Sequence, residues 1–314
     1  MRVVVLLSTW QGERFIEEQL RSILGSLPAD GRIIVRDDGS TDGVVARIES
    51  LGESRVTVLR GENIGFARSF FTLLHAAPDD ADLVMFSDQD DVWLPDKIGR
   101  AMAALAPLRD EPALYCSRLR LVDEHLHPLG LSPAWPRPPS FRNALVENIA
   151  FGCTCALNRA GLLLARRNGD ERLLQFHDWW LYLVISAFGR VVADPEPTIL
   201  YRQHTANSVG ARLGWRRYTH AIRFLGRKNW VHAMFAQIDN FRRVHGDRLE
   251  PEDRRLLDRY FDPRRPSAVA RLLLMPVRFR QRLPDEVLLR LLLLANLLSG
   301  RRLLPDAASE SPRT

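Results

Sequence analysis

Short apolar segments alternate with amphipathic ones through the first ninety or so residues, and this alternation constrains the fold more than any other feature. Strands are expected at residues 3–7, 33–35, 56–59 and 83–86, each separated from the next by a helical pattern. Parallel neighbours need a crossover connection, so strand–helix–strand units in series predict a parallel sheet with right-handed crossovers. The sequence therefore predicts an α/β fold with a mostly parallel central sheet flanked by helices.

The fourth predicted strand runs directly into a cluster of acidic side chains. Asp88, Asp90 and Asp91 follow Phe86, and Trp93 comes two positions later. The carboxyl end of a parallel strand is where open α/β sheets bind ligands. Carboxylates at this density suit Mg²⁺ or Mn²⁺, which leave other coordination positions to water and phosphate. The alternative is a solvated acidic loop in front of a helix that begins near residues 95–97.

Polar residues also follow the other predicted strands. Ser8 and Thr9 follow the first, Asp37 and Asp38 the second, and residues 63–68 the third. Each cluster alone also fits the N-cap of the next helix. Because the carboxyl ends of parallel strands lie on one edge of a sheet, convergence of four clusters favours a single site.

The middle of the chain is less regular. A helix is expected from about residue 175 to 188, with Asp178 in its first turn, where a favourable interaction with the helix dipole competes with a catalytic role. The other expected elements are strands at 113–117, 119–122, 149–158, 191–193 and 198–200 and a proline-rich loop at 130–140.

Length and cysteine content bound the class of protein. A chain of 314 residues predicts one large α/β domain with an appendage. Its three cysteines form no CxxC pair, and residues 3–7 are too short for a secretory signal. We therefore expect a reducing, cytoplasmic environment.

Charge is divided unevenly along the chain. Residues 211–314 hold 22 basic and 11 acidic side chains, whereas the first 210 hold 22 basic and 27 acidic ones. A basic tail predicts an anionic partner: nucleic acid, an anionic membrane surface or phosphorylated lipids. Residues 285–298 are too few to span a bilayer, so they pack on the domain or lie in a membrane interface. Nucleic acid is not expected, because no aromatic–basic platform or helix-turn-helix pattern accompanies the charge.

Six motifs follow one another along the chain. They are LLSTWQGERFIEEQLRSI at 6–23, VRDDGSTDG at 35–43, NIGFARSF at 63–70, FSDQDDVWLPDK at 86–97, HDWW at 177–180 and YRQHTANSVGA at 201–211. Together they resemble the inverting family-2 glycosyltransferases of GT-A fold, a Rossmann-like α/β architecture, and more narrowly their bacterial rhamnosyltransferase-like members. The resemblance covers residues 1–211 as the catalytic domain and leaves residues 212–314 as a helical basic extension.

The resemblance implies a donor side and a metal site. Asp90 of the DxD motif would bind Mg²⁺ or Mn²⁺, and His204 would supply a further metal ligand. Asp88 would face the ribose or the water shell of the metal. The remaining donor residues would be Ser8, Thr9, Asp37 and Asp38 for the nucleotide and Arg68 for the diphosphate.

An acceptor side follows from the same resemblance. Asp178 would be the catalytic base that takes the proton of the acceptor hydroxyl. Many relatives have Glu-Asp where this chain has His177-Asp178, and the role of His177 stays open. Expected sugar or acceptor contacts are Asp91, Trp93, His177 and Trp179.

The implied activity is metal-dependent, inverting transfer of a sugar, with L-rhamnose from dTDP-L-rhamnose as the expected donor. The acceptor would be a surface polysaccharide or lipid-linked glycan at the inner face of the membrane, with peripheral contact there. A sugar-phosphate nucleotidyltransferase is one alternative, but STWQGE replaces the glycine-rich basic loop it would need. A non-catalytic nucleotide-sugar-binding protein is another, and the joint presence of Asp88, Asp90, Asp178 and His204 argues against it.

Overall fold

The computed structural model describes residues 1–204, 230–265, 267–299 and 303. The expected boundary between residues 211 and 212 lies outside these residues, as does most of the motif at 201–211.

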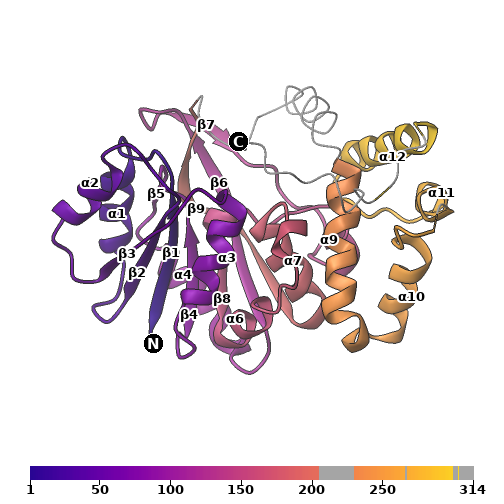
Figure 1. Ribbon diagram of the computed structural model, residues 1–314, viewed down its shortest axis with the longest axis horizontal. Coiled ribbons are helices and arrows are strands. Elements are labelled where there is room, and N and C mark those ends of the chain that lie inside the picture. Colours follow the sequence, from indigo (N-terminus) through magenta and orange to yellow (C-terminus); the bar gives the residue numbers. More distant parts are fainter. Residues whose placement is uncertain (205–229, 266, 300–302, 304–314) are drawn as a thin grey trace.

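Four parallel strands form one half of the central sheet. They are β1 (Val3–Thr9), β2 (Arg32–Asp37), β3 (Val56–Arg60) and β4 (Leu83–Ser87), in the spatial order β3-β2-β1-β4. The predicted parallel arrangement of the first four strands is therefore confirmed, and their carboxyl ends share one edge of the sheet (Figure 1).

The other half of the sheet is mixed. β8 (Ala156–Asn158) pairs antiparallel with β4 and with β6 (Ala113–Val122), and β6 runs parallel to β9 (Arg190–Arg202). β5 (Val92–Trp93) completes the path beside β9, and β7 (Pro128–Leu131) pairs with β6. Antiparallel β8 thus joins two parallel groups into one sheet, which has nine strands in the part of the chain that the structure describes.

Some predicted boundaries in the middle of the chain were wrong. The expected strand at 149–158 is only β8, because the chain first makes a 3₁₀ turn, Gly152–Thr154, with Thr154 N–H donating to Phe151 C=O. The expected loop at 130–140 starts inside β7. The two pairs of short strands at 113–122 and 191–200 are continuous strands with irregular register, β6 and β9.

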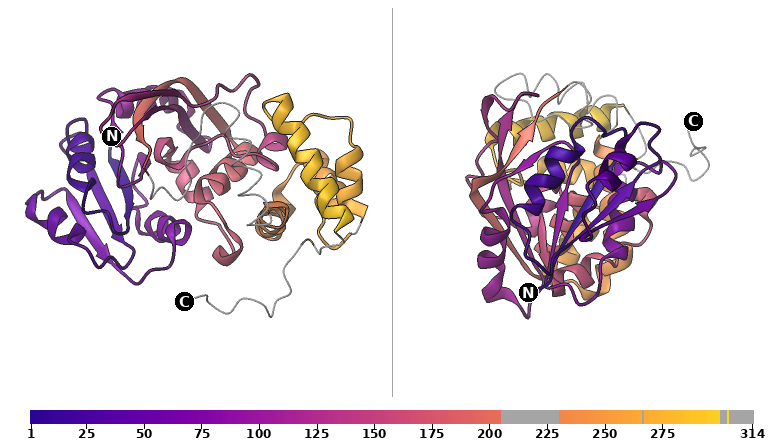
Figure 2. Two further views of the ribbon diagram at one scale, coloured as in Figure 1. Left: turned by 90° about the horizontal axis from the view of Figure 1, so that it is seen from above. Right: turned by 90° about the vertical axis from the view of Figure 1, so that its left-hand side faces the viewer.

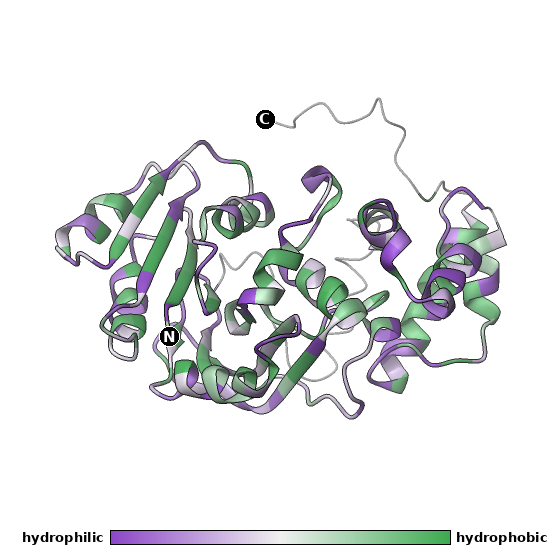
Figure 3. Ribbon diagram, turned by 90° about the horizontal axis from the view of Figure 1, so that it is seen from below, coloured by the Kyte–Doolittle hydropathy of each residue, from purple (hydrophilic) through white to green (hydrophobic). Residues whose placement is uncertain are grey.

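Helices cover both faces of the sheet (Figure 2). Alternation along β1 divides its side chains: Val3, Val5 and Leu7 join one core cluster, whereas Val4 and Leu6 join the other. The first cluster includes α1 (Ile16–Leu24), α2 (Val44–Ser50) and α4 (Lys97–Leu105). The second includes α3 (Phe66–Ala76), α5 (Phe141–Ala144), α6 (Arg159–Ala165) and α7 (His177–Phe188). Figure 3 shows the strands mainly in the hydrophobic colours, as burial on both faces requires.

Four further helices extend the second core cluster beyond α7. They are α9 (Trp230–His245), α10 (Pro251–Tyr260), α11 (Ser267–Leu274) and α12 (Leu283–Leu298) (Figure 1). Trp179 of α7 stacks on Trp230 of α9 with ring centroids 6.0 Å apart, and Phe241 packs against Trp180. The C-terminal helices thus pack on the sheet-bearing region, and none of the helices in the described residues is long and apolar enough to cross a membrane.

Candidate active site

Gln89 ties the loop after β4 to the turn after β1. Its Oε1 accepts from Thr9 Oγ1 at 2.6 Å and from Trp10 N–H at 2.8 Å, and its Nε2 donates to Trp10 C=O at 3.0 Å. A Cβ on Gly12 would collide with this amide, so a side chain at position 12 would displace Gln89 from these bonds. The two strand-end loops are therefore one braced unit, as the predicted convergence requires.

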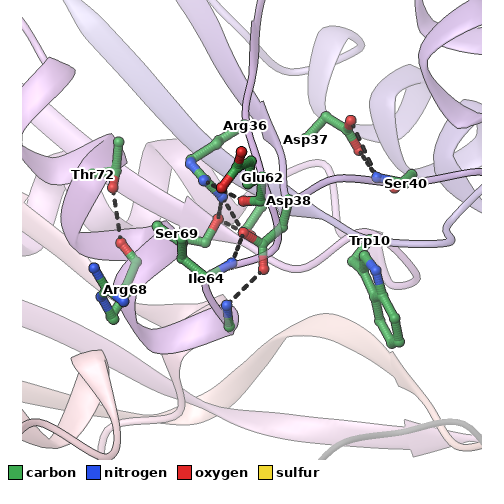
Figure 4. A network of polar contacts seen from close by, with 12 residues as sticks. Trp10, Arg36, Asp37, Asp38, Ser40, Glu62, Ile64, Arg68, Ser69 and Thr72 are labelled. Atoms are coloured by element: carbon green, nitrogen blue, oxygen red, sulfur yellow. Dashed lines mark hydrogen bonds and ion pairs between the residues drawn. The ribbon is translucent and has the colours of Figure 1, made fainter. Parts of the chain in front are cut away.

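Asp38 is buried and holds the loop before α3 (Figure 4). Its carboxylate accepts from Ile64 N–H and Gly65 N–H, both at 2.9 Å, and pairs with the Arg36 guanidinium. Arg36 also donates to Ser69 Oγ, which lies 2.6 Å from Ser8 Oγ. Ser8 and Asp38, both expected at the nucleotide, thus have protein partners that position β1, β2 and α3.

Asp37 and Trp10 lie on the same edge of the sheet (Figure 4). The Asp37 carboxylate accepts from Ser40 N–H at 3.2 Å, which turns the chain away from β2. The Trp10 ring, 53% exposed, presents a large aromatic surface that the core does not use. An exposed tryptophan offers a stacking surface to a planar ligand, whereas the Asp37 carboxylate is only 5% exposed and presents little of its surface.

Asp90 and His204 lie side by side although 114 positions separate them. His204 Nε2 is 2.7 Å from Asp90 Oδ2, and both side chains are about one-seventh exposed. The Phe15 ring packs against His204, and the Arg202 guanidinium lies 4.6 Å from the centre of that ring. Arg202 also donates from Nε to Asp90 C=O, which fixes the end of β9 against the acidic loop.

Asp88 and Asp91 form a second, deeper group with Cys153, their ligand atoms all lying within 4.8 Å of one another. Asp91 is fully buried and accepts from Arg202 N–H at 3.0 Å. Burial, followed by the neighbouring carboxylates, raises the pKa of Asp91 well above its usual value and that of Asp88 to about 7. Burial also raises the pKa of the Cys153 thiol, which favours the neutral form and makes it a poor ligand for a hard cation.

Lys97 supplies a buried positive charge beneath this group. Its side chain is fully buried, its Nζ donates to Cys153 C=O at 2.6 Å, and it lies 4.6 Å from the centre of the Trp93 ring. Burial lowers the pKa of Lys97 to about 8, while Asp88 and Asp91 favour its charged form. The ammonium therefore offsets part of the repulsion among the acids.

Asp178 begins α7 and faces the acidic loop. Its Oδ2 accepts from Gly152 N–H at 3.0 Å, and its Oδ1 accepts from Trp179 N–H at 2.7 Å. Burial raises the pKa of Asp178 to about 6, and its charge in turn raises the pKa of Asp88. A partly exposed carboxylate with a pKa near neutrality is suited to accept a proton.

His177 is enclosed rather than open to a ligand. Its ring stacks on Phe70 with centroids 3.9 Å apart, and a Cβ on Gly152 would lie 2.7 Å from its Nε2. Burial lowers the pKa of His177 to about 3, so the ring is neutral. Gly152 and His177 therefore fit closely and set the position of the α7 start.

Three other expected contact residues are placed differently. Trp93 and Trp179 are each only 3% exposed and belong to the core, and Trp179 Nε1 donates to Ala144 C=O. Asp91 has no exposed surface, so direct contact with a sugar would require the loop to open. Arg68 is exposed on the first turn of α3, across the Asp38 network from Trp10 (Figure 4).

Sequence reasoning assigned no role to four residues that build this edge: Trp10, Gln89, Lys97 and Gly152. The first three lie inside the quoted motifs STWQGE and SDQDDVWLPDK, so the motifs themselves carried the signal. Gly152 follows Phe151 in a small-residue stretch that carries no chemical signal. Its part in the site depends on a long-range contact, 26 positions from Asp178.

Comparisons with known proteins place the chain in a family. The model of the family "Glycosyl transferase family 2" matches residues 4–163, half of the chain. The dTDP-rhamnosyl transferase RfbG of Shigella flexneri is 29% identical over 229 residues, covering 67% of this chain and 75% of that protein. The succinoglycan biosynthesis protein ExoW of Rhizobium meliloti is 30% identical over 33% of this chain and 34% of its own.

The fold likewise matches solved structures. S. aureus TarS 1-349 in complex with UDP-GlcNAc superposes with a TM-score of 0.55 and 15% identity, covering 96% of this chain and 93% of that one. This likeness concerns the arrangement of sheet and helices, including the C-terminal helical region. Together with the family match, it identifies a glycosyltransferase: the chain belongs to glycosyl transferase family 2 and has the GT-A fold.

Proposed function

We propose that the chain is an inverting glycosyltransferase that moves L-rhamnose from dTDP-L-rhamnose to a glycan hydroxyl with the help of a divalent cation. The observation that carries this proposal is the position of Asp178 beside the acidic loop: Gly152 N–H holds its carboxylate, and the Sγ of the next residue, Cys153, lies within 4.8 Å of carboxylate oxygens of Asp88 and Asp91. A base and a diphosphate-binding loop on one site are what sugar transfer from a nucleotide sugar needs. The dTDP-rhamnosyl transferase activity named for RfbG supports the choice of donor.

The donor nucleotide would lie across the ends of β1 and β2. Trp10 offers a ring on which a base can stack, and the Asp37 carboxylate can accept from base N–H or ribose hydroxyl groups. Ser8, Thr9 and Asp38 already have protein partners, so we assign them to holding the donor site in shape. We assign Arg68 to the diphosphate because this residue is exposed on the first turn of α3, directly after the loop that Asp38 holds. S. aureus TarS, with the same fold, binds UDP-GlcNAc.

The residues present fit a divalent cation. Asp90 and His204 are partly exposed and 2.7 Å apart, so both could face an ion that also contacts phosphate. Asp88 would take part through the water shell. Asp91 and Cys153 lie deeper, and we assign Asp91 to holding the end of β9. Mg²⁺ or Mn²⁺ bound there would neutralise the charge that grows on the departing nucleoside diphosphate.

The transfer itself depends on the chain's own residues as follows. Asp178 accepts the proton of the acceptor hydroxyl while its oxygen forms a bond to C1 of the sugar. The bond from C1 to the phosphate oxygen breaks, and the nucleoside diphosphate leaves with the electron pair. Attack from the Asp178 side, opposite the diphosphate, inverts the anomeric centre. Gly152 N–H holds one carboxylate oxygen, leaving the group oriented for this step.

The acceptor we propose is a surface polysaccharide or lipid-linked glycan, reached at the cytoplasmic face of the membrane. The succinoglycan biosynthesis role named for ExoW supports a polysaccharide acceptor. Within this proposal, residues 1–211 form the catalytic domain, and residues 212–314 form a basic helical extension peripheral to the membrane.

A thermal-shift screen with Mn²⁺ tests the donor. We expect dTDP and dTDP-L-rhamnose to raise the melting temperature more than the uridine or guanosine equivalents, and the shift to disappear with EDTA. A stronger shift with UDP or GDP sugars would overturn the thymidine assignment. Equal shifts with and without the cation would overturn the metal site. Product analysis by NMR then reports whether the anomeric configuration is inverted.

A further inference from the structure

Helix α12 exposes an apolar face, whereas an ordinary surface helix exposes a polar one. Its exposed residues recur at helical spacing, and all of the large ones are apolar. Exposure runs from 39% at Leu294 to 78% at Leu298. The exposed set is Leu283, Val287, Leu291, Leu294, Leu297 and Leu298.

The polar residues of α12 instead face the protein. Glu286 is buried, and its Oε2 accepts from Phe279 N–H and Arg280 N–H at 3.0 and 2.9 Å. Arg290 pairs with Glu286 and donates to the carbonyls of Leu272, Leu273 and Val277. These bonds hold the helix in one rotation about its axis, so the leucine face stays outward.

Basic residues outnumber acidic ones in the sequence around α12. Residues 264–302 contain nine arginines and two acidic residues, and both acids, Asp285 and Glu286, are buried. Some of these arginines have ion-pair partners, but Arg282 is exposed immediately before α12. Among the described residues 264–299, the exposed charge next to the leucines is therefore basic.

Helix α11 repeats the combination of apolar and basic side chains. Leu274 is 79% exposed, and Arg271 lies one turn earlier on the same helix face. Arg271 also borders a hollow between α10 and α11, which is lined by Arg255, Asp258, Arg259, Arg265 and Arg271. Among the described residues, Arg255, Arg259 and Arg271 have no ion-pair partner.

We propose that the exposed faces of α11 and α12 form a membrane-docking surface for anionic lipids. The leucines would enter the boundary between head groups and acyl chains, with the helix lying in the plane of the membrane. The surrounding arginines would contact lipid phosphates. Charge complementarity decides for an anionic membrane over a second copy of the chain, because two copies would place like charges against each other. The proposal specifies the surface behind the peripheral contact included in the proposed function, and it does not depend on the roles of Asp90 or Asp178.

The test is flotation of the full chain with vesicles of phosphatidylcholine alone or with added phosphatidylglycerol. The variant V287Q/L291Q/L294Q replaces three exposed side chains while keeping good helix formers. We expect it to lower partitioning onto anionic vesicles at least about tenfold, since each side chain loses favourable apolar transfer. The matched control L129Q/L131Q/L163Q changes three residues of similar exposure on β7 and α6 and should partition like the unchanged protein.

The charge half of the proposal has its own variants. R271Q/R282Q should weaken binding to anionic vesicles severalfold and reduce its dependence on salt. Circular dichroism and the thermal shift with dTDP check that each variant is folded and retains its donor site.

Three outcomes overturn the docking surface. One is unchanged flotation of V287Q/L291Q/L294Q, and another is equal binding to vesicles with and without phosphatidylglycerol. The third is that the unchanged protein is a dimer in light scattering and binds no vesicles, whereas the variant is a monomer. Failure of dTDP binding with intact flotation would overturn only the proposed donor.

Discussion

The proposed donor side of the site and the proposed acceptor side are constructed in different ways. Loops after all four parallel strands make up the donor side: Gln89 ties the loop after β4 to the turn after β1, and Asp38 and Arg36 tie the end of β2 to the loop after β3. On the acceptor side, a single carboxylate, Asp178, accepts from Gly152 N–H, from Trp179 N–H in its own first turn and from the Asn148 side chain. Several loops braced together are suited to hold an extended nucleotide in one pose. One carboxylate fixed at a helix start is suited to take a proton from a hydroxyl placed beside it.

Replacing Asp178 by asparagine gives the sharpest separation of the two sides. Asparagine keeps the size of the side chain but cannot take the acceptor proton, so we expect turnover to fall about a hundredfold to ten-thousandfold. Donor affinity, measured by calorimetry with dTDP, should change little. Asp247→Asn is a control because that residue is 97% exposed on a distant turn. Turnover near the unchanged rate in Asp178→Asn would remove the residue from the base role.

The same contrast explains what the sequence could predict. The donor side follows from local patterns, because each parallel strand delivers its polar residues to one edge whatever the rest of the chain does. The positions of Ser8, Asp37 and Asp90 at that edge could therefore be predicted from the sequence alone. The sequence did not show that Ser8 and Asp38 have partners within the protein. Those partners, Ser69 and Ile64, come from α3 and the loop before it.

The acceptor side depends on pairings that no local pattern encodes. Gly152 reaches Asp178 because β8 runs antiparallel to β4 and a 3₁₀ turn precedes it, although the residues read as a continuous strand. Trp93 and Trp179 suggested sugar contacts, but packing against distant elements encloses both. Burial of this kind depends on which helices cover the sheet, and that is a property of the tertiary structure rather than of any single segment.

Changing Asp90 to asparagine tests the metal on the donor side. Loss of one charged ligand should weaken donor binding about tenfold to a hundredfold in the presence of Mn²⁺. Asp96→Asn is the matched control, because Asp96 lies in the same motif but is exposed before α4. Calorimetry with dTDP, with and without EDTA, measures the donor affinity of both variants. Equal Mn²⁺-dependent binding by Asp90→Asn and the control would place the cation elsewhere.

The brace itself is tested by replacing Gln89 with leucine. Leucine fills a similar volume but removes the three bonds to Thr9 and Trp10, so the β1 turn should loosen and donor affinity fall about tenfold. Gln89→Glu keeps both accepted bonds, loses the donated one and adds a negative charge between Asp88 and Asp90, so its donor affinity should also fall. Turnover at saturating donor should be nearly unchanged in both variants, whereas a loss confined to turnover would contradict a positioning role.

The smallest expected effect is on the pH dependence of stability, which should differ between a variant of the donor side and a variant of the acceptor side. Asp88, with its pKa raised to about 7, is protonated more readily in the folded protein than in the unfolded one. Between the pKa of Asp88 in the unfolded chain and about pH 7, the folded state therefore binds more protons than the unfolded state. Stability falls as pH rises through that window. Without divalent cations we expect the melting temperature to drop by a few degrees between about pH 5 and about pH 8. Asp88→Asn should flatten that slope more than Asp178→Asn, because the pKa of Asp178 is raised only to about 6. Differential scanning calorimetry at a series of pH values measures the melting temperatures of both variants. An equal slope in Asp88→Asn and in the unchanged protein would contradict a contribution of Asp88 to the pH dependence. The repulsion among the acids would then be offset by another group, and the buried Lys97 ammonium is the first to test.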